Sequence, residues 1–85
     1  MIFQSKIYVR YKPGISDPES INILSALDKL GFENAKSLST GKFFELEIES
    51  KDLKSAKNEI KKICNQLLTN PVIEQYKFDI SEFNQ

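Results

Sequence analysis

The sequence predicts an α+β domain in which two helices lie on one face of an antiparallel-rich sheet. Segments that alternate apolar and polar residues, as half-buried strands do, occur near both ends and in the middle of the chain. Two segments with apolar residues every three or four positions, typical of amphipathic helices, separate them. A Gly41-Lys42 pair before the central strand suits a two-residue hairpin turn. The expected order is strand, helix, strand, strand, helix, strand.

The first strand is expected over residues 3–11, where Phe3, Ile7 and Val9 alternate with polar side chains. It is followed by Lys12-Pro13-Gly14-Ile15, in which proline and glycine occupy the two central positions of a type II turn. In such a turn the glycine takes a positive φ, and the strand must end before it.

The first helix is expected from about Pro18 to Leu30. Asp17 can cap its N-terminus, or Ser16 can form a capping box with Glu19. Gly31 has the position of a C′ glycine, where a helix commonly ends. The apolar stripe of this helix consists of Ile23, Leu24, Leu27 and Leu30, flanked by Ile21 and Ala26. That stripe is expected to face the core.

A hairpin is expected at the centre of the chain. Its first strand, residues 32–40, is weakly patterned and should be an edge or interface strand, and its second strand follows the Gly41-Lys42 turn. As the first central residue of a type II′ turn, Gly41 would have a positive φ. The second strand places Phe44, Leu46 and Ile48 on the core face and Glu45, Glu47 and Glu49 on the other. Those glutamates either face another chain or form a solvated surface.

The second helix begins after Asp52, a good capping residue, and ends before Asn70-Pro71, since the residue before proline disfavours the α region. Its predicted apolar stripe consists of Leu53, Ala56, Ile60, Ile63 and Leu67. The last strand is expected over residues 72–80, with Tyr76, Phe78 and Ile80 on one face. Residues 81–85 are expected to fray.

This order corresponds to a split βαβ arrangement, βαββαβ, over residues 1–85 as a single domain. A ferredoxin-like sheet is the default solution for it. The alternative is a long hairpin that leans away from the body and pairs with another subunit. A chain of 85 residues has a small core, so burial of further surface by self-association is favoured.

Composition narrows the possible functions. Twelve basic and twelve acidic residues cancel, which argues against nucleic acid as a partner. No apolar run is long enough to span a membrane and the N-terminus does not resemble a signal peptide, so a cytoplasmic location is expected. The chain has no histidine, and its single cysteine, Cys64, has no activating neighbour and is expected to be a buried thiol. No catalytic, cofactor-binding or metal-binding constellation is predicted.

Five short motifs, in this order and spacing, resemble the PurS subunit of phosphoribosylformylglycinamidine synthase. They are Lys12-Pro13-Gly14, Asp17-Pro18, Leu30-Gly31-Phe32, Gly41-Lys42-Phe43-Phe44-Glu45-Leu46-Glu47 and Asn70-Pro71-Val72-Ile73-Glu74-Gln75-Tyr76. The chain departs from the family pattern at Ser39, where arginine is frequent, and at Ser20, where glycine is frequent. The resemblance implies a PurS-like variant of the fold.

The resemblance also implies a non-catalytic subunit of an ATP-dependent C–N ligase in purine biosynthesis. Such a subunit brings a PurL-type synthetase and a PurQ-type glutaminase together, so that ammonia from glutamine converts formylglycinamide ribonucleotide to formylglycinamidine ribonucleotide. ATP and Mg²⁺ are then used by the synthetase, and this chain, which binds neither, forms a homodimer or tetramer. The candidate partner-contact residues are Lys12, Asp17, Lys42, Glu45, Asn70 and Glu74. The fold alone allows a second class, an oligomeric regulatory domain that binds a small metabolite.

Overall fold

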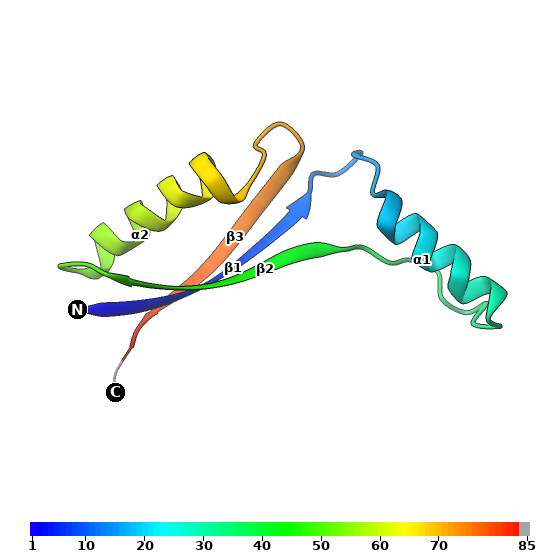
Figure 1. Cartoon of the computed structure of the whole chain (residues 1–85), viewed down its shortest axis with the longest axis horizontal. Helices are drawn as coiled ribbons and strands as arrows, with labels where there is room; N and C mark the ends of the chain where they lie inside the picture. Colours follow the sequence, from blue (N-terminus) through cyan, green and yellow to red (C-terminus); the bar gives the residue numbers. More distant parts are fainter. Residues whose placement is uncertain (84–85) are drawn as a thin grey trace.

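The computed structural model describes residues 1–83 and confirms the α+β class. Its elements are β1 (Ile2–Tyr11), α1 (Pro18–Lys29), β2 (Gly41–Glu49), α2 (Leu53–Ile63), a π-helical segment (Cys64–Leu68) and β3 (Glu74–Glu82). The strands form one sheet in the order β2-β1-β3, with β1 antiparallel to both neighbours (Figure 1). Because β2 and β3 flank β1 and run parallel to each other, β2, α2 and β3 form a split βαβ unit.

The core lies between this sheet and α2. Alternate residues of β1 are buried on the side that faces α2, and two residues of α2 and the first of the π-helical segment pack against them. The buried apolar residues are Phe3, Ile7, Val9, Ala56, Ile60 and Cys64. Residues of β2 and β3 complete this layer, among them Phe44, Leu46, Ile48, Tyr76, Phe78 and Ile80. The predicted core faces of all three strands are therefore confirmed.

The end of α2 differs from the expected regular helix. At its start, Asp52 accepts a hydrogen bond from the Ser55 backbone N–H at 2.7 Å, as predicted. At its end, the Thr69 N–H donates to the Cys64 carbonyl, five residues back, at 3.0 Å. This wider π-type turn changes which side chains face the sheet, so Leu68 packs on the core and the predicted Leu67 is 79% exposed.

The expectation that both helices cover one face of the sheet is wrong for α1. Figure 1 shows α2 lying along the sheet, whereas α1 lies beyond the end of β1, on the far side of the molecule from the two termini. The radius of gyration is 16.8 Å, against about 12 Å for a compact chain of this length. The accessible surface of 6394 Å² likewise exceeds the roughly 5200 Å² typical of this mass. The apolar stripe of α1 is thus largely uncovered.

The expected hairpin is also corrected, because residues 32–40 form no strand and the sheet has three strands within residues 1–83. Its proposed turn residues, Gly41 and Lys42, are the first residues of β2, and Gly41 has no positive φ. The 12 residues of α1 extend about 18 Å away from the sheet, and the segment after it must cover that distance on its return. Residues 32–40 serve as this return segment.

Three local predictions at the turns and termini can be compared with the structure. The Ile15 N–H donates to the Lys12 carbonyl at 3.1 Å and Gly14 has a φ of +86°, as a type II turn requires. Gly31, with a φ of +95°, ends α1 as predicted. Fraying from residue 81 is wrong, because β3 continues to Glu82 and the Phe83 N–H donates to the Ile2 carbonyl at 2.8 Å. Residues 84–85 lie outside the described part of the chain.

Candidate partner-contact site

Five of the six predicted contact residues lie at one end of the sheet, where β1 ends and β2 and β3 begin. Lys12 follows β1, Asp17 precedes α1, and Lys42 is the second residue of β2. Asn70 belongs to the loop that leads into β3, and Glu74 is the first residue of that strand. The antiparallel register explains this gathering, since the C-terminal end of β1 must lie beside the N-terminal ends of both neighbouring strands.

Lys12, Asn70 and Glu74 hold the loop before β3 in place. The Lys12 N–H donates to the Ile73 carbonyl at 2.9 Å, and its ammonium Nζ donates to the Pro71 carbonyl. The Asn70 N–H donates to Glu74 Oε1 at 2.7 Å, and the Glu74 N–H returns a bond to the Asn70 carbonyl at 2.7 Å. These groups are therefore engaged within the chain, and what they present to a partner is a fixed loop.

Lys42 and Glu74 form an ion pair across the start of β2 and β3, with 3.9 Å between Nζ and Oε2. The Glu74 side chain is 12% exposed, whereas that of Lys42 is 63% exposed. A pair with one such exposed member contributes little to stability. Its effect is to direct the Lys42 ammonium from β2 across the end of β1 toward β3.

Asp17 connects α1 to the start of β2. Its Oδ1 accepts the Ser20 N–H at 3.1 Å, which is the predicted N-cap. Its Oδ2 accepts both the Thr40 N–H at 3.1 Å and the Thr40 hydroxyl at 2.8 Å. Partial desolvation acts to raise the pKa of Asp17, but the hydrogen bonds from Thr40 and Ser20 outweigh it and hold the pKa below its usual value.

An Asp17→Asn variant is expected to be less stable than the parent chain at neutral pH and equally stable in acid. Because the pKa of Asp17 is lower in the folded state, its ionised form stabilises the fold above the ordinary aspartate value of 3.8. That contribution is lost as the pH falls through the lowered folded-state pKa. Thermal melts between pH 7 and pH 2.5 would show the two melting temperatures converging. A difference that persists unchanged to the lowest pH would contradict the assignment.

Glu45, the sixth predicted residue, does not belong to this group. It lies further along β2, opposite Lys6 of β1, on the sheet face that α2 leaves uncovered. Glu47 and Glu49 follow it on the same face, so the predicted acidic stripe exists and is exposed. This acidic stripe occupies one half of the uncovered sheet face, and Arg10 and Lys77, described below, occupy the other half.

The two departures from the family pattern both take part in hydrogen bonds. The Ser39 Oγ accepts a bond from the Arg10 guanidinium at 3.0 Å. Ser20 is 7% exposed, and its hydroxyl donates to the Asp17 carbonyl at 3.0 Å. Ser20 therefore supports the backbone at the start of α1, and Ser39 connects the return segment to the Arg10 side chain of β1.

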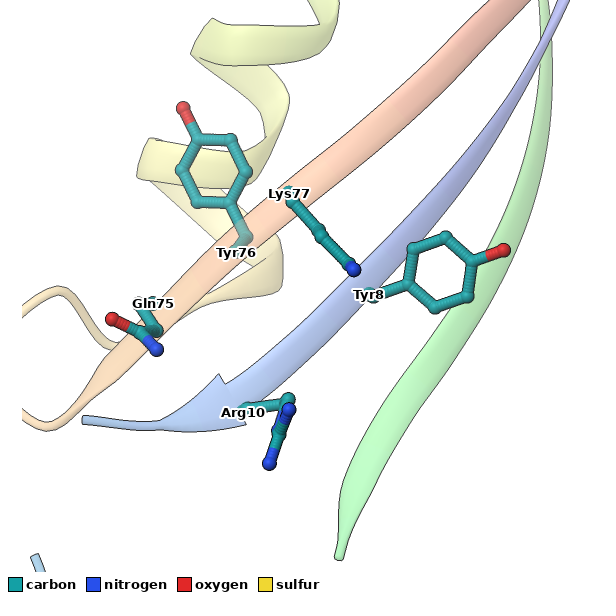
Figure 2. A pocket seen from close by; sticks show the side chains of 5 residues that line it. All are labelled: Tyr8, Arg10, Gln75, Tyr76 and Lys77. Carbon is teal, nitrogen blue, oxygen red and sulfur yellow. The ribbon is translucent and has the colours of Figure 1, made fainter. Parts of the chain in front are cut away.

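Sequence reasoning assigned no role to a shallow hollow on the uncovered sheet face. Figure 2 shows it: Tyr8, Arg10 and Lys77 lie on the side of the sheet away from α2, whereas Tyr76 points toward α2. With Gln75 they line a volume of about 130 Å³. The Lys77 ammonium is 5.6 Å from the centroid of the Tyr8 ring. The alternation of β1 already placed Arg10 on the polar face, but only strand pairing brings Lys77 beside Tyr8.

The chain contains a single thiol, that of Cys64. Cys64 directly follows α2 and is fully buried, as predicted, and burial raises the pKa of its thiol. Within residues 1–83, no three histidine, cysteine, aspartate or glutamate side chains are grouped so that they could hold a metal ion. None of the helices described over those residues has the length and apolar character needed to cross a membrane.

The chain matches the family model PurS, described as phosphoribosylformylglycinamidine (FGAM) synthase, over residues 4–82. It is 43% identical over 70 residues to subunit PurS of Archaeoglobus fulgidus, covering 82% of this chain and 88% of that protein. It is 35% identical over 79 residues to subunit PurS of Synechocystis, covering 93% and 79% of the two chains.

Solved structures agree with the family match. The crystal structure of Methanocaldococcus jannaschii PurS superposes with a TM-score of 0.86 at 30% identity, covering 96% of this chain and 99% of that one. A chain in the structure of PurLQS from Thermotoga maritima superposes with a TM-score of 0.87 at 32% identity, covering 95% and 99%. By sequence and by fold, the chain belongs to the PurS family of phosphoribosylformylglycinamidine synthase subunits.

Proposed function

We propose that this subunit of phosphoribosylformylglycinamidine synthase has no catalytic step of its own and acts by assembling the complex. Its superposition on a chain of the Thermotoga maritima PurLQS structure, over nearly the full length of both chains, carries this proposal. The candidate contact residues support it, because their hydrogen bonds fix loops at one end of the sheet.

The proposed partners are a PurL-type synthetase and a PurQ-type glutaminase. The synthetase binds ATP and Mg²⁺, the glutaminase releases ammonia from glutamine, and this chain holds the two sites in a relation that lets ammonia pass between them. The end of the sheet formed by Lys12, Asp17, Lys42, Asn70 and Glu74 is the proposed contact, since several loops are fixed there side by side. The proposed location is the cytoplasm. The family match favours this role over the regulatory metabolite-binding class.

Self-association is part of the proposal. Helix α1 carries exposed apolar residues, with Ile21 58% exposed and the C-cap residue Leu30 73% exposed, and is joined to the body by hydrogen bonds around Asp17. A helix of 12 residues is marginally stable without packing of its apolar face. Cover from another chain would supply that packing. A homodimer or tetramer is therefore proposed.

Reconstitution tests the assembly role. With synthetase, glutaminase, nucleotide and glutamine present, omission of this chain is expected to abolish glutamine-dependent activity, while activity with added ammonium salt remains. That pattern is expected because the chain is proposed to couple two intact active sites. Co-elution of all three chains in size-exclusion chromatography is the accompanying measurement. Unchanged glutamine-dependent activity, or turnover by this chain alone, would contradict the proposal.

The oligomeric state has its own measurement. Light scattering of the purified chain at micromolar concentration is expected to give at least the mass of a dimer, twice 9.8 kDa. A monomeric mass over this concentration range would contradict self-association.

A further inference from the structure

The sheet face away from α2 is cationic and aromatic at the end next to α1. Two adjoining hollows lie there: the one in Figure 2, of about 130 Å³, and a second of about 270 Å³. Tyr8 and Arg10 line both of them. The first also includes Lys77, and the second extends over Lys42 and Phe43. Within residues 1–83 no aspartate or glutamate lines either hollow, so this area is suited to a negatively charged ligand.

Arg10 is exposed, and its side chain is already oriented by the chain itself. Its Nη2 donates to the Ser39 Oγ at 3.0 Å, which leaves the other N–H groups of the guanidinium for a ligand. On the β2 side Arg10 is paired with Gly41, where a Cβ atom would lie 3.3 Å from Arg10 Cγ. Gly41 therefore keeps the space beside Arg10 open. The planar guanidinium fork fits two oxygens of a phosphate group.

The next row of the sheet, Phe43-Tyr8-Lys77, takes one residue from each strand and supplies a stacking surface. Phe43 is 51% exposed, and its ring centroid lies 5.2 Å from that of Tyr8. The Lys77 ammonium lies 5.6 Å from the centroid of the Tyr8 ring on the other side. An exposed aromatic ring beside cations is the combination on which nucleic-acid bases stack while their phosphates are bound.

The chain itself does not neutralise the two cations that flank Tyr8. The ion pair of Lys42 with Glu74 is the only one within residues 1–83, so Arg10 and Lys77 lack a carboxylate partner there. Further along the same face lies the acidic stripe of β2. A long polyanion laid along the strands would reach that stripe and be repelled. The ligand that fits is therefore short.

We propose that this area binds a nucleoside monophosphate, with the phosphate held by Arg10 and Lys77 and the base stacked on Phe43. A phosphate alone would leave the Phe43 ring uncovered, and an uncharged ring would leave both cations unpaired. Lys77 and Phe43 stand on the two strands that flank β1, about 10 Å apart, a distance that a nucleoside monophosphate spans between its phosphate and its base. The site goes beyond the assembly role and does not depend on it.

Titration of the purified chain with three probes tests the proposal. The probes are adenosine 5′-monophosphate, ribose 5-phosphate, which lacks the flat ring, and adenosine, which lacks the phosphate. Two-dimensional NMR of the isotope-labelled chain gives both the Kd and the residues affected. Adenosine 5′-monophosphate is expected to bind with a Kd below about 1 mM, with shifts centred on Tyr8, Arg10, Phe43 and Lys77. The other two probes are expected to bind about tenfold more weakly, because each makes only part of the contacts.

Two variants separate the phosphate contact from the base contact. Arg10→Gln is expected to weaken binding of adenosine 5′-monophosphate about tenfold or more and to abolish detectable binding of ribose 5-phosphate, because both probes lose a charged contact. Phe43→Leu is expected to weaken binding of the nucleotide about fivefold or more and to leave ribose 5-phosphate unchanged, because only the nucleotide has a ring to stack.

An exposed lysine of α2 provides the matched control. Lys61→Gln removes one positive charge away from the sheet face and is expected to leave the Kd unchanged. Thermal melts of every variant check that the fold is intact. Lys77→Gln tests the same phosphate contact without the loss of the bond to Ser39 that Arg10→Gln involves, and is expected to weaken nucleotide binding as well.

Several outcomes would overturn the proposal. One is the absence of saturable shifts up to about 10 mM adenosine 5′-monophosphate. Another is a set of shifts centred on the lysines of α2 or on the start of α1, which would place anion binding elsewhere. Equal affinity for the nucleotide and ribose 5-phosphate, or a Phe43→Leu variant that binds as the parent does, would refute the stacked base. None of these results bears on the assembly role, which reconstitution measures separately.

Discussion

Replacing Ile60 by alanine is expected to lower the free energy of unfolding by about 2–5 kcal/mol. Ile60 is fully buried and packs with Ile7, Val9 and Cys64, and it belongs to α2, the helix that covers the sheet. Removing its side chain leaves a cavity between helix and sheet that the surrounding residues can only partly fill. A chain of 85 residues is typically stable by about 4–13 kcal/mol, so this loss is a large fraction of the total. Urea denaturation followed by circular dichroism would measure it.

Ile21→Ala provides the matched control on α1. Ile21 is 58% exposed, so the same truncation is expected to change the free energy of unfolding by less than about 0.5 kcal/mol in the dissociated chain. Both variants should be compared at a concentration below that of self-association, because binding adds to apparent stability. Equal losses for the two variants would mean that α1 packs on the core, contrary to the structure.

Replacing Gly41 by alanine is expected to destabilise the chain by about 1–3 kcal/mol. A Cβ atom at Gly41 would lie 2.6 Å from the Val9 carbonyl oxygen, which is backbone of the central strand and cannot move without disturbing the sheet. The glycine is therefore required for close approach of β2 to β1. Lys42→Ala, at the next position, is the control and should change stability by less than about 0.5 kcal/mol, since that side chain is 63% exposed.

A Gly41→Asn variant separates this explanation from the hairpin that the sequence suggested. At a positive φ, asparagine is tolerated better than alanine, so a type II′ turn would make Asn the milder change. In the structure Gly41 has no positive φ and the obstacle is contact with Val9, so Asn is expected to cost at least as much as Ala. A clearly more stable Asn variant would restore the hairpin interpretation.

Some features of this protein follow from its sequence because they depend on neighbouring residues. The Asp17 and Asp52 caps, the Gly14 turn and the end of α1 at Gly31 all rest on interactions within about four positions. The alternation of each strand likewise identifies its buried face, since only one face of the sheet meets a core. The positions of the candidate contact residues follow from local patterns to the same extent: Lys12, Asp17 and Asn70 belong to turns or a cap, and Lys42 and Glu74 are at the start of strands.

Other features were decided by the tertiary structure. The stripe on α1 predicts that one face is to be buried, but amphipathicity does not specify what buries it, and here the chain's own sheet does not. Glycine is common in turns, which is why the sequence suggested a turn at Gly41. In the structure Gly41 is needed because β2 passes so close to the Val9 carbonyl oxygen of β1 that a Cβ atom does not fit. The placement of Lys77 beside Tyr8 on the open face also required the register of β1 and β3. Local patterns in the sequence therefore determined both helices, three of the four expected strands and the apolar side of each. Long-range contacts decided that residues 32–40 form no strand, where α1 lies and which surfaces stay open, because such contacts join residues far apart in the chain.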